Sequence, residues 1–146
     1  MNTSRIRAAL LTAAVSVVVA SAAPAFAESV SYKADLKGST EVPPTETKGT
    51  GSVDAIYDTA SKKLSWTINY SGLSGPATAA HFHSPAEAGK NAPPTVPLSG
   101  KLDSPIKGDA TLTDAQATDL KDGKMYFNVH TAANKGGEIR GQVAKK

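Results

Sequence analysis

The sequence contains no cysteine, and this absence excludes several kinds of chemistry at once. Disulfide bonds, thiolate metal sites, cysteine nucleophiles and a lipid anchor on an N-terminal cysteine are all impossible. A domain built from this chain must therefore be stabilised by its hydrophobic core, without covalent cross-links. Exported proteins often contain disulfides but do not require them, so the absence of cysteine leaves the compartment open.

The sequence also lacks a cluster of positive charge. Its 16 basic and 13 acidic residues give a formal net charge of +3, to which Arg5 and Arg7 contribute near the N-terminus. The rest of the chain is close to neutral, and lysines such as Lys62 and Lys121 are interleaved with acidic residues. Nucleic-acid-binding proteins typically carry a clustered basic face, so we expect no nucleic-acid partner.

Long apolar runs are missing except near the N-terminus, where residues 8–20 read AALLTAAVSVVVA. This run follows two arginines and precedes Ala25 and Ala27, which fit the small-residue rule of signal peptidase. A membrane span needs about 20 apolar residues, so we expect residues 1–27 to be a cleaved secretory signal; an uncleaved anchor is the alternative. The mature chain, residues 28–146, would then be one secreted or periplasmic domain without a membrane segment.

Alternation of polar and apolar residues dominates the rest of the chain. Period two over short runs is typical of half-buried β-strands, and turn-forming clusters such as NAPPTVPLSG separate the runs. Many short strands and abundant turn residues favour an antiparallel β-sandwich or a Greek-key barrel. The clearest alternating runs are SVSYKADLKG, KKLSWTINYSGL, KMYFNVHT and GEIRGQVA.

One segment breaks the alternation and predicts a short helix. Thr113 is followed three residues later by Gln116, which is the spacing of a capping box. Asp114 suits the positive end of a helix dipole, and Gly123 suits a left-handed stop. We therefore expect a helix from Asp114 to Asp122 that connects two strands.

The chain has only three histidines, His81, His83 and His130. Strand residues two apart share a face, so His81 and His83 project together while Phe82 points to the core. By the same rule Phe127 faces the core and His130 lies on the opposite face. The spacing alone does not bring the two strands together, so three separate solvent-exposed histidines remain the alternative.

Three imidazoles that meet would form a metal site. A His-x-His pair on a rigid strand can share one ion, and a third imidazole from a neighbouring strand completes a three-nitrogen set. Imidazole suits Zn²⁺ and Cu²⁺, and Cu²⁺ binds more tightly to a given set of ligands. Three protein ligands with an open position are also the arrangement of catalytic zinc. We therefore expect a copper ion, with zinc as the second choice.

Three further residues could support such a site. Glu138 and Arg140 share one strand face and could orient an imidazole or attract an anion. They could equally form a surface ion pair, worth under about 1 kcal/mol. Asn128 could orient a neighbouring ligand, although a solvent-facing asparagine on a strand is just as ordinary.

Two stretches resemble the CHRD domain family. The first is AAHFHSPAEAG, which is similar to the A-H-x-H-x-P-A element of that family. The second is MYFNVHTAANKGGEIRGQV, which is similar to its Y-x-N-V-H-T and G-E-I-R-G-Q elements. The resemblance extends from Val30 to Val143 and implies an exported, immunoglobulin-like β-domain.

A fainter resemblance concerns the order of the histidines. The chain contains H-x-H, then V-H, then G-G, and then an arginine before G-x-V. This order is similar to that in copper–zinc superoxide dismutase, itself a Greek-key sandwich. This resemblance implies that His81, His83 and His130 bind copper and that Arg140 guides an anionic substrate. The bridging histidine, the remaining zinc ligands and the disulfide cysteines of that family have no counterpart here.

Two functions follow from these observations. The first is an exported domain that binds a transition-metal ion and handles it, or carries out redox chemistry towards superoxide. The second is a non-catalytic extracellular binding or matrix module with no metal. The sequence leaves open whether the protein is an enzyme, and it identifies no protein partner.

Overall fold

The computed structural model describes residues 27–146, so the expected signal sequence, residues 1–27, lies outside the described part apart from its last residue. Within this part no helix is long and apolar enough to cross a membrane. The described elements are β1 (Ser29–Lys37), a 3-10 turn (Gly38–Thr40), β2 (Thr50–Asp58), β3 (Lys63–Ser71), β4 (Ala77–His83), β5 (Pro94–Pro97), β6 (Ile106–Thr111), α1 (Asp114–Lys121), β7 (Tyr126–Thr131), β8 (Ile139–Gln142) and β9 (Ala144–Lys145).

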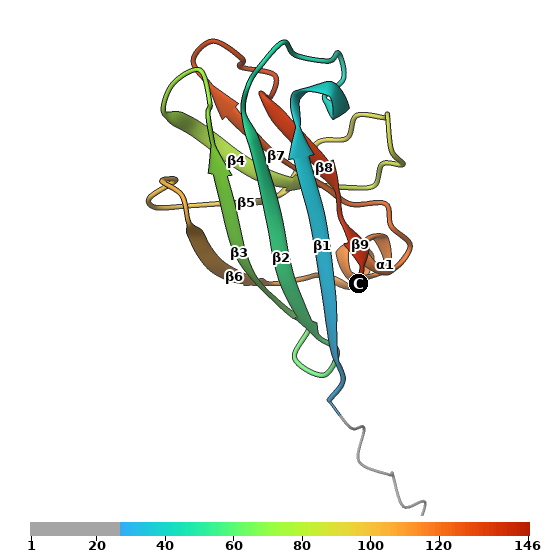
Figure 1. Ribbon diagram of the computed structural model, residues 1–146. Coiled ribbons are helices and arrows are strands. Elements are labelled where there is room, and N and C mark those ends of the chain that lie inside the picture. The colour runs from blue at the N-terminus through green and yellow to red at the C-terminus, as the bar shows by residue number, and fades with distance from the viewer. Residues whose placement is uncertain (1–26) are drawn as a thin grey trace, which may run out of the picture.

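The strands form one strongly bent antiparallel sheet in the order β5-β4-β7-β8-β1-β2-β3-β6, and β9 pairs with β1. In Figure 1 the strands β1, β2 and β3 run together, and β4, β7 and β8 lie behind them as a second layer. The sheet turns between the layers where β1 and β8 share the single pair Lys37 and Arg140. The all-β antiparallel fold with one short helix is therefore confirmed.

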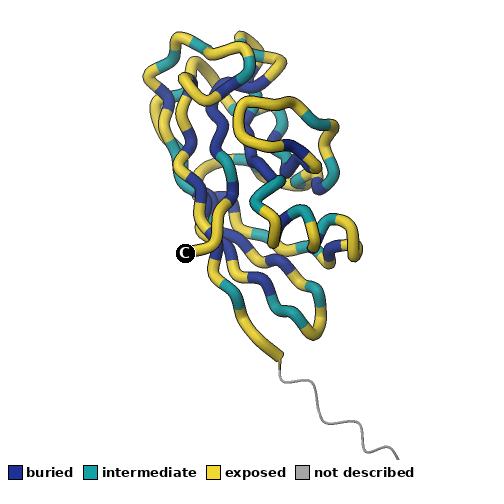
Figure 2. Tube along the Cα trace, turned by 90° about the vertical axis from the view of Figure 1, so that its right-hand side faces the viewer, coloured by how far each residue is buried: buried dark blue, intermediate teal, exposed yellow. Residues whose placement is uncertain are grey.

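The hydrophobic core lies between the two layers. Each strand sends alternate residues inward, and Figure 2 shows the resulting alternation of buried and exposed positions along the chain. The ring of Phe82 packs against Trp66 of the front layer at 5.2 Å and against Phe127 of its neighbouring strand at 4.8 Å, between centroids. Strand phase thus places Phe82 and Phe127 in the core, as the alternation predicts.

Loops cover part of the opposite face of β4 and β7, on which His81 and His130 are half-buried. Tyr126 and Asn128 project to this face and are nevertheless only 3% and 2% exposed. The segment between β4 and β5 folds over them, and the backbone of Ala92 forms hydrogen bonds with the Tyr126 hydroxyl. The alternative of a solvent-facing Asn128 is therefore wrong, because periodicity within a strand says nothing about loops from elsewhere.

The helix α1 has the predicted capping box. The Thr113 hydroxyl accepts from the Gln116 backbone N–H at 3.2 Å, and the Gln116 side chain accepts from the Thr113 N–H at 2.9 Å. The helix buries Ala117 and Leu120 and is followed by Gly123 at φ 70°, a left-handed stop. Its end at Lys121, with Asp122 as the cap, agrees with the predicted boundary.

Replacement of Thr113 by alanine should lower the free energy of unfolding by about 1 kcal/mol, because the N–H of Gln116 loses its acceptor. Urea titration followed by circular dichroism measures this change through the midpoint of unfolding. Thr113→Ser is the matched control, since it keeps the hydroxyl, and it should remain close to the wild type. Equal stability of Thr113→Ala and the wild type would show that the cap contributes nothing.

Candidate metal centre

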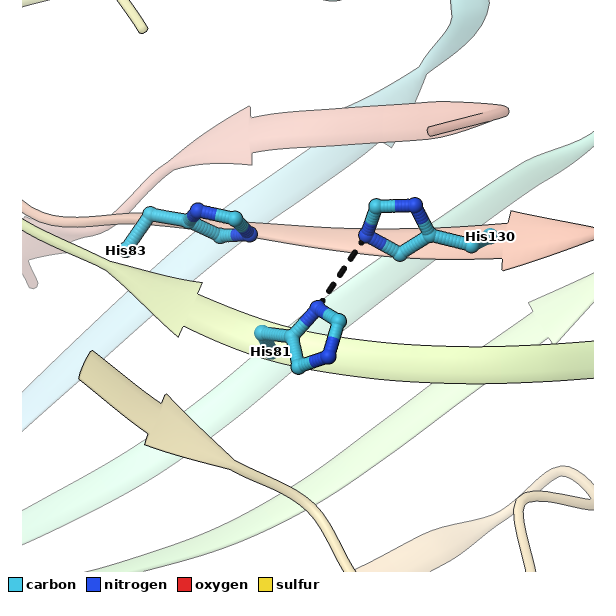
Figure 3. Close-up of side chains that lie close together, drawn as sticks. All are labelled: His81, His83 and His130. Atoms are coloured by element: carbon cyan, nitrogen blue, oxygen red, sulfur yellow. Dashed lines mark hydrogen bonds between the residues drawn. The ribbon is translucent and has the colours of Figure 1, made fainter. Parts of the chain in front are cut away.

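The pairing of β4 with β7 brings the three histidines together. In this antiparallel pair His81 lies opposite Asn128, His83 lies opposite Tyr126, and His130 lies opposite Ala79. His81 and His130 are therefore diagonal neighbours on one face of the sheet. Figure 3 shows the three imidazoles turned towards one another. One ring nitrogen from each lies within 4.8 Å of the other two, and His81 Nδ1 is 3.1 Å from His130 Nε2.

Backbone carbonyls fix the orientation of two of the rings. His83 Nδ1 donates to the carbonyl oxygen of Ala92, and His130 Nδ1 donates to that of Lys135, each at 2.9 Å. A carbonyl oxygen only accepts, so both Nδ1 atoms carry the proton and both Nε2 atoms keep a lone pair in the neutral ring. The Nε2 lone pair of His130 then accepts from His81 Nδ1. Outer hydrogen bonds of this kind orient metal-binding histidines in many proteins.

The side chain of Asn128 lies between the two fixed rings. Its Oδ1 is 2.9 Å from Nε2 of His83 and 2.9 Å from Nε2 of His130. Its Nδ2 points the other way and donates to Oε1 of Glu41 at 3.3 Å. The amide oxygen and the imidazole lone pairs therefore face the same point.

Glu41 is the residue of this site that the sequence does not reveal. It lies in the loop after β1, is 4% exposed, and is remote in sequence from every histidine. Burial raises the pKa of Glu41 to about 7, although the hydrogen bond from Asn128 and the charge of Arg140 act in the opposite direction. An isolated glutamate in a Pro-rich loop carries no pattern that could have marked it.

The environment of His81 and His83 favours the neutral imidazole. Burial lowers the pKa of His81, and the neighbouring His130 and His83 lower it further. Burial also lowers the pKa of His83, against the opposing effect of the hydrogen bonds with Ala92 and Asn128. A neutral imidazole is the form that binds a metal ion, so a lower pKa reduces competition from protons.

Arg140 lies beside the site rather than in it. Its guanidinium carbon is 3.4 Å from the ring centroid of Tyr126, and His83 stacks on the same ring at 4.5 Å. Because β7 runs between β4 and β8, Arg140 and His83 lie on opposite faces of Tyr126. Arg140 is 2% exposed and donates to Lys90 O at 2.5 Å and to Asn91 Oδ1 at 2.9 Å. It thus holds the loop whose next carbonyl, that of Ala92, orients His83.

Glu138 also lies apart from the imidazoles. It is fully buried and belongs to none of the ion pairs in the described part of the chain, so the alternative of a surface pair with Arg140 is wrong. Its carboxylate accepts five hydrogen bonds, two of them from Ser74, and the others from Thr47, Thr131 and Asn134. These bonds fix the turn after β7, which contains the Lys135 carbonyl that orients His130.

The site residues expected from the sequence therefore fall into two groups. The three histidines and Asn128 come together, whereas Glu138 and Arg140 support the loops that surround them. That Arg140 guides an anion stays a prediction, and so does the similarity to copper–zinc superoxide dismutase.

Comparison with known proteins gives one family. A family model described as the CHRD domain matches residues 32–143, which is well over half of the chain. Neither a curated protein nor a solved structure matches the sequence at a significant level.

Proposed function

We propose that this chain, which belongs to the CHRD domain family, binds one transition-metal ion through His81, His83 and His130. The observation that carries the proposal is the convergence of three imidazole nitrogens, two of them fixed by Nδ1–H bonds to carbonyls. These carbonyls leave each fixed ring with a lone pair directed at the common point. The ion itself would be copper, or zinc as the second choice.

The acceptor atoms at this point suit a cation. His83 Nε2 and Asn128 Oδ1 lie 2.9 Å apart, and both are acceptors when Nδ1 carries the only proton of the neutral imidazole. The same is true of His130 Nε2 and the same oxygen. A metal ion at this point would be attracted by the amide oxygen and by the imidazole lone pairs together. Three imidazoles chelate a metal ion, whereas a proton needs only one.

We propose that the protein handles or stores the metal after export, with residues 1–27 acting as a cleaved signal. Arg140 is buried behind Tyr126 and already donates to Lys90 and Asn91, so the surroundings favour binding over the steering of a superoxide anion. A non-catalytic extracellular module without metal is the competing function, and the following measurement separates the two.

Addition of Cu²⁺ or Zn²⁺ to the metal-free protein should raise its unfolding temperature. A ligand at 100 times its dissociation constant adds about 2.7 kcal/mol to the free energy of unfolding. For a domain of this size that corresponds to a rise of roughly 10 °C. Differential scanning calorimetry measures the rise, and Mg²⁺, which prefers oxygen ligands, serves as the control ion.

A variant with alanine at all three histidine positions is the matched protein control, because the chain has no other histidine. It should unfold at the same temperature with and without Cu²⁺. An equal rise in this variant and in the wild type would place the bound ion elsewhere and contradict the proposal, as would no rise in the wild type.

A further inference from the structure

We infer that the side-chain oxygen of Asn128 is a fourth ligand to the metal ion, which closes the site to water and small anions. This inference rests on the proposed three-histidine site and goes further, because it decides how the bound ion can react. Three histidines alone would leave a coordination position open, as in catalytic zinc sites, whereas four protein ligands are typical of closed sites.

The position of the oxygen supports direct ligation. Asn128 Oδ1 lies 2.9 Å from the Nε2 atoms of both His83 and His130, and His130 Nε2 lies 3.1 Å from His81 Nδ1. Ligand atoms of a tetrahedral ion with bonds of 2.0–2.1 Å are about 3.3 Å apart. These three separations are within about 0.5 Å of that value, and the histidine nitrogens, which lie within 4.8 Å of one another, would draw together around a bound ion.

Glu41 orients the side-chain amide of Asn128 through a hydrogen bond at the end away from the imidazoles. The Glu41 carboxylate accepts from Asn128 Nδ2, so Oδ1 is the end of the amide that faces the imidazoles. Both side chains are buried, at 4% and 2% exposure. A carboxylate that holds the outer end of a metal ligand is a common way to fix that ligand.

The absence of a side chain at Gly137 makes room for this pair. A Cβ atom added to Gly137 would lie 2.1 Å from Glu41 Oε1 and 2.5 Å from Asn128 Nδ2. The backbone of Gly137 also has φ 126°, a conformation that other residues rarely adopt. Gly137 therefore leaves the space in which the Glu41–Asn128 pair lies, and a side chain at this position would displace the pair.

A closed site has a chemical consequence. An external ligand such as azide or superoxide must bind at an open position to react directly with the ion, and Asn128 would occupy that position. The domain would then hold its ion without offering it to small anions, which suits storage or transfer to a protein rather than turnover. Removal of the asparagine side chain should open the site.

The test uses the copper-loaded protein with azide as the probe. Asn128→Ala should bind azide at least roughly tenfold more tightly than the wild type, as measured by the azide-to-copper charge-transfer absorption, because removal of the amide oxygen frees one coordination position. Asn69→Ala is the matched control, because Asn69 is an exposed asparagine of β3, and it should behave as the wild type. Azide binding that is as tight in the wild type as in Asn128→Ala would overturn the inference.

A second measurement uses the unmodified protein and so does not depend on the folding of a variant. In water enriched in ¹⁷O, a coordinated water molecule broadens the paramagnetic resonance signal of Cu²⁺. The wild type should show no broadening, and broadening would overturn the closed site while leaving the three-histidine site intact. Failure of the wild type to bind Cu²⁺ at all would instead contradict the proposed function, and the fourth ligand with it.

Discussion

Replacement of His130 by alanine is expected to lower the affinity for Cu²⁺ by more than about 100-fold. Loss of an outer residue that merely orients a ligand typically costs 10–100-fold in metal affinity, and His130 would be a direct ligand. His130 lies on β7, which pairs directly with the strand β4 that carries His81 and His83. The three-histidine site therefore exists only because these two strands are neighbours. Competition with a chelator of known affinity measures the change.

The same loss is expected for His81→Ala and His83→Ala, because each removes one of three nitrogens that share an ion. His130 is only half-buried, so His130→Ala should leave the unfolding temperature of the metal-free protein close to that of the wild type. A large loss of Cu²⁺ affinity together with an unchanged unfolding temperature would identify His130 as a metal ligand rather than as a residue that contributes only to packing. Cu²⁺ affinity that is unchanged in His130→Ala would reduce the site to the His81 and His83 pair and contradict the three-histidine proposal.

The second large effect concerns the stability of the fold at low pH. Burial alone would raise the pKa of Glu138, but hydrogen bonds from Ser74, Thr131 and Thr47 outweigh burial and lower the pKa from 4.5 to about 2. At about 1.4 kcal/mol for each pH unit, this difference corresponds to about 3 kcal/mol in favour of the folded state. The ionised carboxylate therefore joins several loops by hydrogen bonds, in a chain that has no cysteine to join them by a disulfide.

The direction of the pH dependence follows from the lowered pKa. The folded state binds the proton more weakly than the unfolded state, so the stabilisation is complete above about pH 4.5 and is lost as the pH falls to about 2. The wild type should lose about 3 kcal/mol over this range relative to Glu138→Gln, which lacks the carboxylate. Urea unfolding at a series of pH values measures the difference between the two proteins.

Glu46→Gln is the matched control, because Glu46 is exposed and lies in the same group of loops. It should follow the pH dependence of the wild type. A constant difference between the wild type and Glu138→Gln from pH 4.5 to pH 2 would show that the hydrogen bonds to Glu138 do not lower its pKa.

The alternation of side chains along a strand predicted that the three histidines lie on the face away from the core. This alternation depends only on local backbone geometry, so the sequence suffices to read it. Alternation within MYFNVHT separated Phe127 from His130, and alternation within AHFH separated Phe82 from His81 and His83. The capping box predicted the helix for the same reason, since both of its hydrogen bonds lie within four residues. The family resemblance also rested on continuous stretches of sequence, and the family match confirms it.

Contacts between distant segments could not be predicted in this way. The register that sets His81 opposite Asn128 depends on which strands become neighbours, and no spacing within either strand encodes that choice. Glu41 reaches Asn128 only because the loop after β1 folds over β7. The burial of Arg140 and Glu138 likewise comes from loops, so their appearance as a surface pair in the sequence was misleading.

The central claim is that one ion lies among three imidazoles, and a crystal structure of the copper-loaded protein tests it most directly. Anomalous scattering at the copper edge should give one peak at about 2 Å from a ring nitrogen of each of His81, His83 and His130. For His83 and His130 that nitrogen should be Nε2, because Nδ1 is bonded to a carbonyl. A peak held by two histidines or fewer, or a peak elsewhere on the molecule, would contradict the account.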